Sequence, residues 1–164
     1  MEIKYYDFET SIGNMYLFFS SKGIVYLSLP KEEEEDIVSQ VKKYGVLQRV
    51  CAEEYKFHNQ IIGYLKGQLK YFNLELDLRG TEFQRKVWNE LLNIPYGETR
   101  TYKEMAKEVG SPRGFRAVGG ALNKNPIPII VPCHRVIGSN GELTGFAGGV
   151  RLKRRLLELE ASNA

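Results

Sequence analysis

The chain has 164 residues, of which 43% are hydrophobic and 12% aromatic, enough for one large domain or two small ones. No apolar run is long enough to span a bilayer, and the N-terminus lacks a signal-peptide pattern, so we expect a soluble protein of the cytoplasm, or of the nucleus in a nucleated cell. Its two cysteines, Cys51 and Cys133, exclude a disulfide framework and form no CxxC zinc motif, although a single bridge between them stays open.

The net charge of +3 is unevenly distributed along the chain. Residues 1–78 carry 9 Lys and Arg against 12 Asp and Glu, a net of −3, whereas residues 79–164 carry 14 against 8, a net of +6. A basic half attached to an acidic half indicates contact with a polyanion such as nucleic acid. An imbalance of this size is also ordinary in proteins without such a partner.

The first half has the pattern of a small α/β scaffold. The β-rich runs Met15–Phe19 and Ile24–Leu29 are joined by a short polar turn, which predicts a hairpin. The acidic residues 32–36 precede apolar positions at helical spacing, and a second helix is expected through residues 57–69. Alternating leucines at 74–78 are typical of a half-buried strand. We therefore predict an α+β protein whose N-terminal domain, residues 1–78, contains an antiparallel sheet and no chemistry.

The second half, residues 79–164, is predicted to be mostly helical. Capping boxes beginning at Thr81 and Thr101 each predict the start of a helix. Ser111 and Pro112 have the residue types of an N-cap and a first helical position, so a third helix is expected from there to about Asn123. Two short helices separated by a Gly-Ser turn predict a helix-turn-helix, or winged-helix-like, domain.

The third of these helices is rich in small residues, which lowers helix stability. They are Gly114, Ala117, Gly119, Gly120 and Ala121. Either another helix packs tightly there, or a nucleic acid approaches the backbone closely. Because Arg113 and Arg116 stand among the small residues of a basic domain, we favour nucleic acid, with Arg116 as a wedge into the base stack.

The most distinctive segment delivers a cysteine and a histidine side by side. The apolar residues 127–131 predict a short buried strand or extended segment, which Pro132 stiffens before Cys133. A reactive thiolate needs a neighbouring base or positive charge, and His134 and Arg135 are candidates. Because consecutive residues of an extended chain point to opposite sides, contact through a water or around a turn is expected. On this adjacency alone, a buried unreactive cysteine is the commoner outcome.

A glycine-rich loop and a helix complete the chain. Thr144–Gly149 lacks the Lys-Ser/Thr ending of a phosphate-binding loop, so a nucleotide site is not expected and a plain connector stays possible. The last helix is predicted from Val150 to Glu160, with Leu152, Leu156 and Leu159 on its apolar side. Its first turns are basic. Glu160 at its end is expected at the surface unless a partner holds it.

Three strings together resemble the C-terminal domain of the O6-alkylguanine-DNA alkyltransferases, or methylated-DNA–protein-cysteine methyltransferases. They are Arg116-Ala117-Val118-Gly119-Gly120-Ala121, Asn125-Pro126 and Pro132-Cys133-His134-Arg135-Val136, and the resemblance extends from Phe83 to Glu160. Members of this family move an alkyl group from guanine to a cysteine of their own. The resemblance implies a monomer that acts on double-stranded DNA carrying O6-alkylguanine, and also O4-alkylthymine, in one irreversible turnover without a cofactor. Some relatives bind zinc in the N-terminal domain through Cys and His, but Cys51, His58, Cys133 and His134 form no recognisable ligand set, so no metal is expected here.

The resemblance also implies roles for single residues. Cys133 would accept the alkyl group, His134 and Glu160 would form a Glu–His–water–Cys relay, Asn125 would support the active-site turn, and Tyr102 would contact the flipped base and the DNA backbone. Arg116 would fill the gap left by the extruded nucleotide. Further DNA contacts are expected from Arg113, Ala117, Gly119 and Arg135, and the guanine pocket from Val136, Phe146, Ala147 and Gly148.

Two departures from the family pattern concern the pocket and the wedge. Phe146-Ala147 replaces the Tyr-Ser of some relatives, which indicates a changed pocket, and Phe115 stands beside the wedge arginine where some relatives have a small residue.

Three other functions fit parts of the sequence. A cysteine hydrolase would use Cys133 and His134 but has no need of a small, basic helix. A helix-turn-helix regulator without catalysis would not need Cys133. A repair protein that binds alkylated guanine without transferring the group would have this cysteine replaced.

Overall fold

The computed structural model describes residues 1–164, and the chain divides into two compact units, Met1–Arg79 and Gly80–Ala164. The four-stranded sheet lies in the first unit and the longest helices in the second. This is the predicted α+β class. None of the helices has the length and apolar character needed to cross a membrane.

The first unit is built on a sheet with strand order β3-β2-β1-β4. Its elements are β1 (Glu2–Thr10), β2 (Gly13–Ser20), β3 (Gly23–Leu27), α1 (Glu34–Val41), η1 (Lys42–Tyr44), β4 (Val46–Arg49), α2 (Ala52–Tyr55) and α3 (His58–Leu65). The pairs β1–β2 and β2–β3 are antiparallel, but β4 pairs with β1 in parallel. The predicted antiparallel sheet is present and gains one parallel pair at this edge, because the crossover through α1 returns the chain in the direction of β1.

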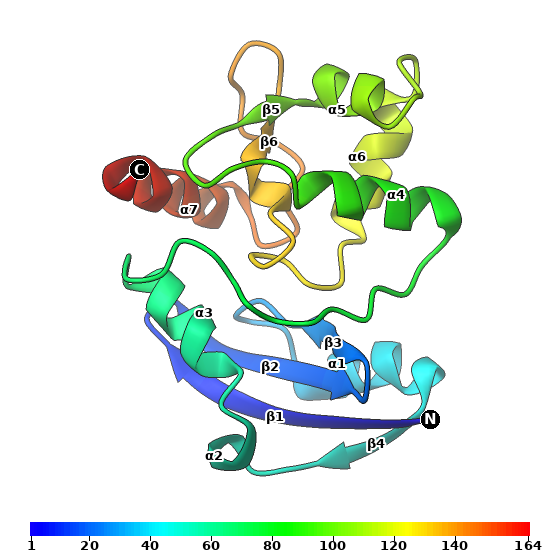
Figure 1. Ribbon diagram of the computed structural model, residues 1–164, viewed down its shortest axis with the longest axis vertical. Helices are drawn as coiled ribbons and strands as arrows, with labels where there is room; N and C mark the ends of the chain where they lie inside the picture. Colours follow the sequence, from blue (N-terminus) through cyan, green and yellow to red (C-terminus); the bar gives the residue numbers. More distant parts are fainter. The chain divides into compact units, whose positions relative to one another are not determined.

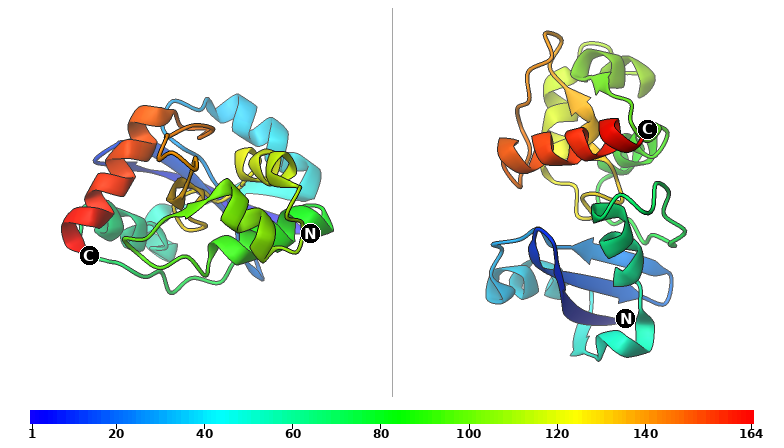
Figure 2. Two further views of the ribbon diagram at one scale, coloured as in Figure 1. Left: turned by 90° about the horizontal axis from the view of Figure 1, so that it is seen from above. Right: turned by 90° about the vertical axis from the view of Figure 1, so that its left-hand side faces the viewer.

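Helices cover both faces of this sheet (Figure 2). On one face, Ile37 and Val41 of α1 pack into a core with Ile3, Phe18 and Val25. On the other face, His58 of α3 packs its ring against Tyr6 and Phe8 of β1. Because side chains alternate along a strand, Ile3 points to one face of the sheet and Tyr6 and Phe8 point to the other. Both faces of the sheet are therefore buried. This unit is a scaffold with two aromatic-rich cores.

The second unit contains four helices and a short two-stranded sheet (Figure 1). Its elements are α4 (Glu82–Leu91), β5 (Arg100–Thr101), α5 (Tyr102–Glu108), α6 (Phe115–Asn123), η2 (Cys133–Arg135), β6 (Val136–Ile137) and α7 (Val150–Asn163). Both predicted capping boxes are present, at Thr81 with Gln84 and at Thr101 with Glu104. The Trp88 indole of α4 donates a 2.8 Å hydrogen bond to the Ala121 carbonyl, which fixes α6 against α4.

Two local predictions in this unit are wrong. Helix α6 begins at Phe115 and not at Ser111, because the Ser111 carbonyl accepts a 2.7 Å bond from the Gly114 N–H and closes a separate turn. Residues 127–131 are buried but are no extended strand. The Val131 N–H donates to the Ile127 carbonyl at 2.9 Å, and Ile129 has φ +76°, a strained conformation for a β-branched residue.

The parallel pair β5–β6 was not predicted and decides where the site residues lie. Its register places Arg100 beside Val136 and Thr101 beside Ile137. The start of α5 is thereby joined to the segment that directly follows Cys133. Two strands of two residues each carry no periodic signal, so only the folded chain reveals them.

Candidate functional site

Cys133 opens a single 3₁₀ turn, η2, at the end of the buried 127–131 segment. The Asn125 side chain braces that segment at both ends, since its Nδ2 donates to the Val131 carbonyl at 2.8 Å and its Oδ1 accepts from the Ile127 N–H at 3.0 Å. The Cys133 N–H also bonds the Val131 carbonyl, at 2.8 Å. The thiol thus stands on a tightly cross-linked loop, with only 7% of the residue exposed.

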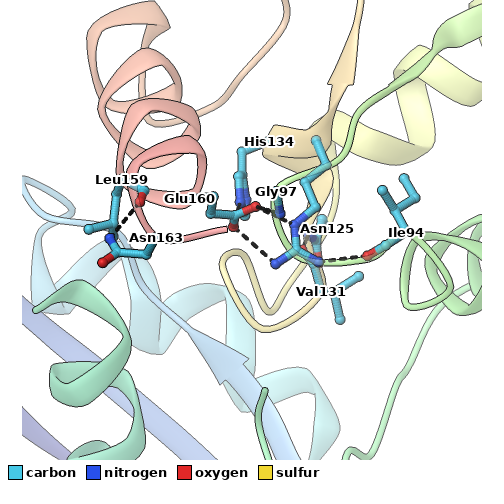
Figure 3. A network of polar contacts seen from close by, with 9 residues as sticks. Ile94, Gly97, Asn125, Val131, His134, Leu159, Glu160 and Asn163 are labelled. Carbon is cyan, nitrogen blue, oxygen red and sulfur yellow. Dashed lines mark hydrogen bonds and ion pairs between the residues drawn. The ribbon is translucent and has the colours of Figure 1, made fainter. Parts of the chain in front are cut away.

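The Glu160 carboxylate of α7 lies at the centre of a buried polar network (Figure 3). Its Oε2 lies 2.7 Å from the Nε2 of His134 and 2.9 Å from a terminal nitrogen of Arg135. Its Oε1 accepts from Arg135 Nε at 2.8 Å and from the Gly97 N–H at 3.1 Å. Contrary to the surface position expected without a partner, Glu160 is buried and joins three segments that are distant in sequence.

The pair formed by His134 and Glu160 sets the proton arrangement of the imidazole. Burial lowers the pKa of His134, although the Glu160 carboxylate opposes that shift, so the ring is neutral near neutral pH. A carboxylate can only accept, which assigns the ring proton to Nε2 and makes Nδ1 the basic nitrogen. The imidazole is therefore oriented as a base by a buried carboxylate.

Arg135 does not take the DNA-binding role predicted for it. Its side chain is buried, grips Glu160 through two nitrogens and donates a third hydrogen bond to the Ile94 carbonyl at 2.7 Å. A guanidinium held in this way cannot reach a phosphate without breaking the network. The charge of Arg135 instead compensates the buried carboxylate.

Lys153 is a buried residue beside the site that sequence reasoning did not single out from the basic first turns of the last helix. It is only 1% exposed, and its Nζ donates to the Thr144 carbonyl at 2.8 Å. The Tyr102 hydroxyl donates to the same carbonyl at 2.9 Å, and the ammonium lies 5.8 Å from the centre of the Tyr102 ring. The available signal was the spacing of Lys153, Leu156 and Glu160, which are the buried positions of α7.

The surroundings of Cys133 act on its thiol in opposite directions. Burial raises the pKa of Cys133 to about 11, whereas the Asn125 side chain and the Lys153 ammonium favour the thiolate. Burial in turn lowers the pKa of Lys153, and the nearby thiol opposes that shift. The thiol is therefore neutral at neutral pH, and becomes a strong nucleophile only when a base removes its proton.

One face of helix α6 is exposed, and its glycines have open space beside them. Arg116 and Ala117 are exposed, as is Arg113 just before the helix. A Cβ placed on Gly119 or Gly120 would meet no atom within 4 Å. Tight packing within the unit therefore does not explain these glycines.

The other predicted pocket residues all follow the cysteine in the chain. Val136 is buried in β6, directly after η2. In the loop before α7, Phe146 is half-buried while Ala147 and Gly148 are exposed. Gly145 of that loop has φ +68°, and a Cβ there would lie 3.0 Å from the Tyr102 hydroxyl, so the loop passes close over Tyr102.

Comparison with known proteins tests the resemblance. The family described as "6-O-methylguanine DNA methyltransferase, DNA binding domain" matches residues 82–162. The methylated-DNA–protein-cysteine methyltransferase of Methanosarcina acetivorans is 47% identical over 161 residues, which cover 96% of this chain and 98% of the relative. The chain belongs to this methyltransferase family. The predicted resemblance is confirmed.

Solved structures of the methyltransferase family have the same fold over the whole chain. The structure of Mycobacterium tuberculosis OGT in complex with DNA has a TM-score of 0.82 and 41% identity, covering all of this chain and 95% of that one. An O6-methylguanine-DNA methyltransferase from Pyrococcus kodakaraensis has a TM-score of 0.66 and 26% identity, covering 96% and 98%. The scaffold unit is thus part of the shared family fold, along with the unit that carries the cysteine.

The two cysteines are both free thiols. Cys51 is exposed in the first unit, directly before α2, and Cys133 is buried in the second. No group of three or more His, Cys, Asp or Glu side chains is arranged to hold a metal ion.

We expect Glu160→Ala to lower the free energy of unfolding by about 3–5 kcal/mol, because the variant leaves the Arg135 guanidinium buried without its counter-charge. Urea denaturation monitored by circular dichroism would measure the loss. Glu158→Ala, at an exposed position of the same helix, is the control and should stay within about 0.5 kcal/mol of the parent protein. Equal effects of the two variants would contradict a central role for the network.

In a Cys51→Ser background, the rate at which iodoacetamide alkylates Cys133, followed by mass spectrometry, should rise with pH around a midpoint of about 11. Lys153→Met should move that midpoint to higher pH, because removing a nearby positive charge disfavours the thiolate. Far-UV circular dichroism over the same pH range would control for unfolding. A midpoint at or below the ordinary value of a free cysteine would show that burial does not govern this thiol.

Proposed function

We propose that this protein, acting as a monomer, removes alkyl groups from O6-alkylguanine, and from O4-alkylthymine, in duplex DNA by transferring them irreversibly to its own Cys133. The observation that carries the proposal is a buried cysteine followed by a histidine whose ring is oriented by a buried carboxylate. Family membership supplies the substrate class. The relative from Methanosarcina acetivorans is named as a methylated-DNA–protein-cysteine methyltransferase.

The reaction begins with proton removal from the thiol. Nδ1 of His134 accepts the Cys133 proton through a bridging water, and Glu160 stabilises the imidazolium that forms. The thiolate sulfur then attacks the alkyl carbon in line with the carbon–oxygen bond. A sulfur–carbon bond forms as the carbon–oxygen bond breaks, and its electron pair passes to the guanine. The leaving guanine is neutralised by a proton from the Tyr102 hydroxyl, which regains one from solvent.

The substrate must leave the base stack before this geometry can be reached, because an O6-alkyl group is shielded inside the duplex. We assign α6 to the DNA, with Arg116 occupying the space of the extruded nucleotide and the glycine face admitting the sugar–phosphate backbone. Arg113 adds a phosphate contact near the start of the helix. Phe146, Ala147 and Gly148 flank the flipped base, and Val136 contacts its edge through main-chain groups.

Tyr102, at the start of α5, must change its hydrogen-bond partner in this scheme. Its hydroxyl is bonded to the Thr144 carbonyl in the free protein. It must exchange this acceptor for the base, while Lys153 keeps its own bond to the same carbonyl. The loop is therefore held in place during the exchange.

A single turnover follows from the product. An S-alkyl cysteine is a thioether, which is neither a nucleophile nor a group that water displaces readily. A cysteine hydrolase would instead pass through an intermediate that water can cleave. A regulator without catalysis would have no use for the base that Glu160 orients beside Cys133.

The stoichiometry of methyl transfer tests the proposal. After incubation with excess O6-methylguanine duplex, peptide mass mapping should find one methyl group, on Cys133, and none on Cys51. Cys133→Ser should abolish transfer but retain duplex binding, because a hydroxyl is far less ionised than a thiol. Removal of many methyl groups per protein, or methylation of another residue, would overturn the proposal and favour the hydrolase.

Gly119→Ala should stabilise the free protein by about 0.5–1 kcal/mol, since the helix is spared a glycine and the new methyl group meets no neighbour. The same variant should bind duplex DNA more weakly, because the added methyl group keeps the backbone at a distance. Thermal unfolding and fluorescence anisotropy would measure the two effects. Gly63→Ala, in α3 of the scaffold unit, is the matched control and should leave DNA affinity unchanged. A destabilised Gly119→Ala protein would instead support helix packing as the reason for this glycine.

A further inference from the structure

The outward face of α6 carries two large side chains at one end and almost none along the rest. Phe115, Arg116, Gly119, Gly120 and Asn123 recur at intervals that place them on one side of a helix, while Val118, Ala121 and Leu122 are buried on the other. Phe115 lies one turn before Gly119, and Arg116 one turn before Gly120. A surface that meets this face therefore contacts a flat floor and two neighbouring projections.

Phe115 is 43% exposed, whereas Trp88 and Tyr96 of the same unit are buried. The remaining aromatic residues of the unit, Phe83, Tyr102 and Phe146, are half-buried. Two arginines stand within two positions of Phe115 in the sequence, and all three side chains are exposed. An exposed aromatic ring flanked by positive charges fits a nucleic acid, because the charges hold the phosphates and the ring stacks on a base. Phenylalanine is also among the apolar residues that proteins insert between base steps from the minor groove.

The proposed function gives Arg116 one task, the space of the extruded nucleotide. A base pair next to that space loses its stacking partner when the nucleotide leaves, and its apolar face is then open to water. Arg116 cannot fill the gap that the nucleotide leaves inside the duplex and also cover that face from the side. Phe115, adjacent in sequence on the same exposed side of α6, is placed to do so.

We propose that Phe115 is a second DNA-distorting residue, which packs its ring against the base step beside the flipped nucleotide and so favours the extrahelical state. This inference rests on the proposed function and assigns a new residue to it. Phe115 acts on the duplex and not on the alkyl carbon, so it is a positioning residue. Its contribution should appear only where a base must leave a stack.

Two readouts separate stacking from chemistry. In a Cys133→Ser background, which holds the complex before transfer, 2-aminopurine placed beside O6-methylguanine should brighten on binding as its stacking is lost. Phe115→Ala should reduce this signal and weaken duplex affinity roughly tenfold, in line with the loss of one base–aromatic contact. With Cys133 intact, Phe115→Ala should slow transfer from duplex DNA but leave reaction with the free O6-alkylguanine base unchanged.

The chain offers a matched control and a rescue. Leu92, at the end of α4, is an apolar residue of the same unit with the same 43% exposure, and Leu92→Ala should have no effect on either readout. Phe115→Trp should preserve both signals, because it keeps an aromatic face. Thermal unfolding should show that Phe115→Ala folds as the parent does, since the side chain is half outside the fold.

The outcomes distinguish this inference from the proposed function. If the parent protein transfers methyl groups to Cys133 and Phe115→Ala matches it on duplex DNA, only the inference is overturned. Equal losses on duplex and free base would also overturn it, because they would place Phe115 in the chemistry or the fold. If the parent protein fails to transfer, the proposed function is wrong, while the 2-aminopurine signal still reports on Phe115.

Discussion

One buried carboxylate is the constraint on which the rest of the cysteine-bearing unit depends. A carboxylate inside a protein is costly unless its oxygens are matched by donors. Glu160 meets this requirement with nitrogens from His134, Arg135 and Gly97, which bring together the end of α7, the 3₁₀ turn and the loop after α4. The stability of the unit and the orientation of the His134 imidazole therefore depend on the same group. Removing the Glu160 carboxylate would therefore affect both the stability of the unit and the orientation of the imidazole.

Burial keeps the Cys133 thiol beside this network protonated and unreactive. Its raised pKa leaves it neutral, and neutral thiols react slowly with oxidants and alkylating agents. In the proposed single-turnover reaction, an unproductive modification of Cys133 is as final as a productive one. Asn125 and Lys153 act against the burial, so the ionised form remains within reach of a positioned base. The site thus combines protection in the free protein with reactivity toward a bound substrate.

Helix α6 shows the same balance between stability and access. Glycines at 119 and 120 weaken a helix, and nothing in the fold uses the space they leave. The helix holds its place through other contacts, among them the Trp88 indole bonded to the Ala121 carbonyl. Its buried side is anchored to α4, so its outer side is free to be shaped for a partner. Gly119 and Gly120 lower the helix propensity of α6 but leave its backbone accessible on that side.

The sequence by itself determined whatever depends on local pattern or on a short diagnostic string: the α+β class, the two capping boxes, α7, and the family through Pro132 to Val136. Tertiary structure alone decided what depends on contacts between distant segments. It made Arg135, predicted to contact DNA, the partner of Glu160, and it buried Lys153 against Thr144 and Tyr102. It also paired β4 with β1 and β5 with β6. The residue type alone does not tell whether a charged side chain faces solvent or a buried counter-charge. The choice is made by the packing of segments that lie tens of residues apart, and no periodicity in the sequence records it.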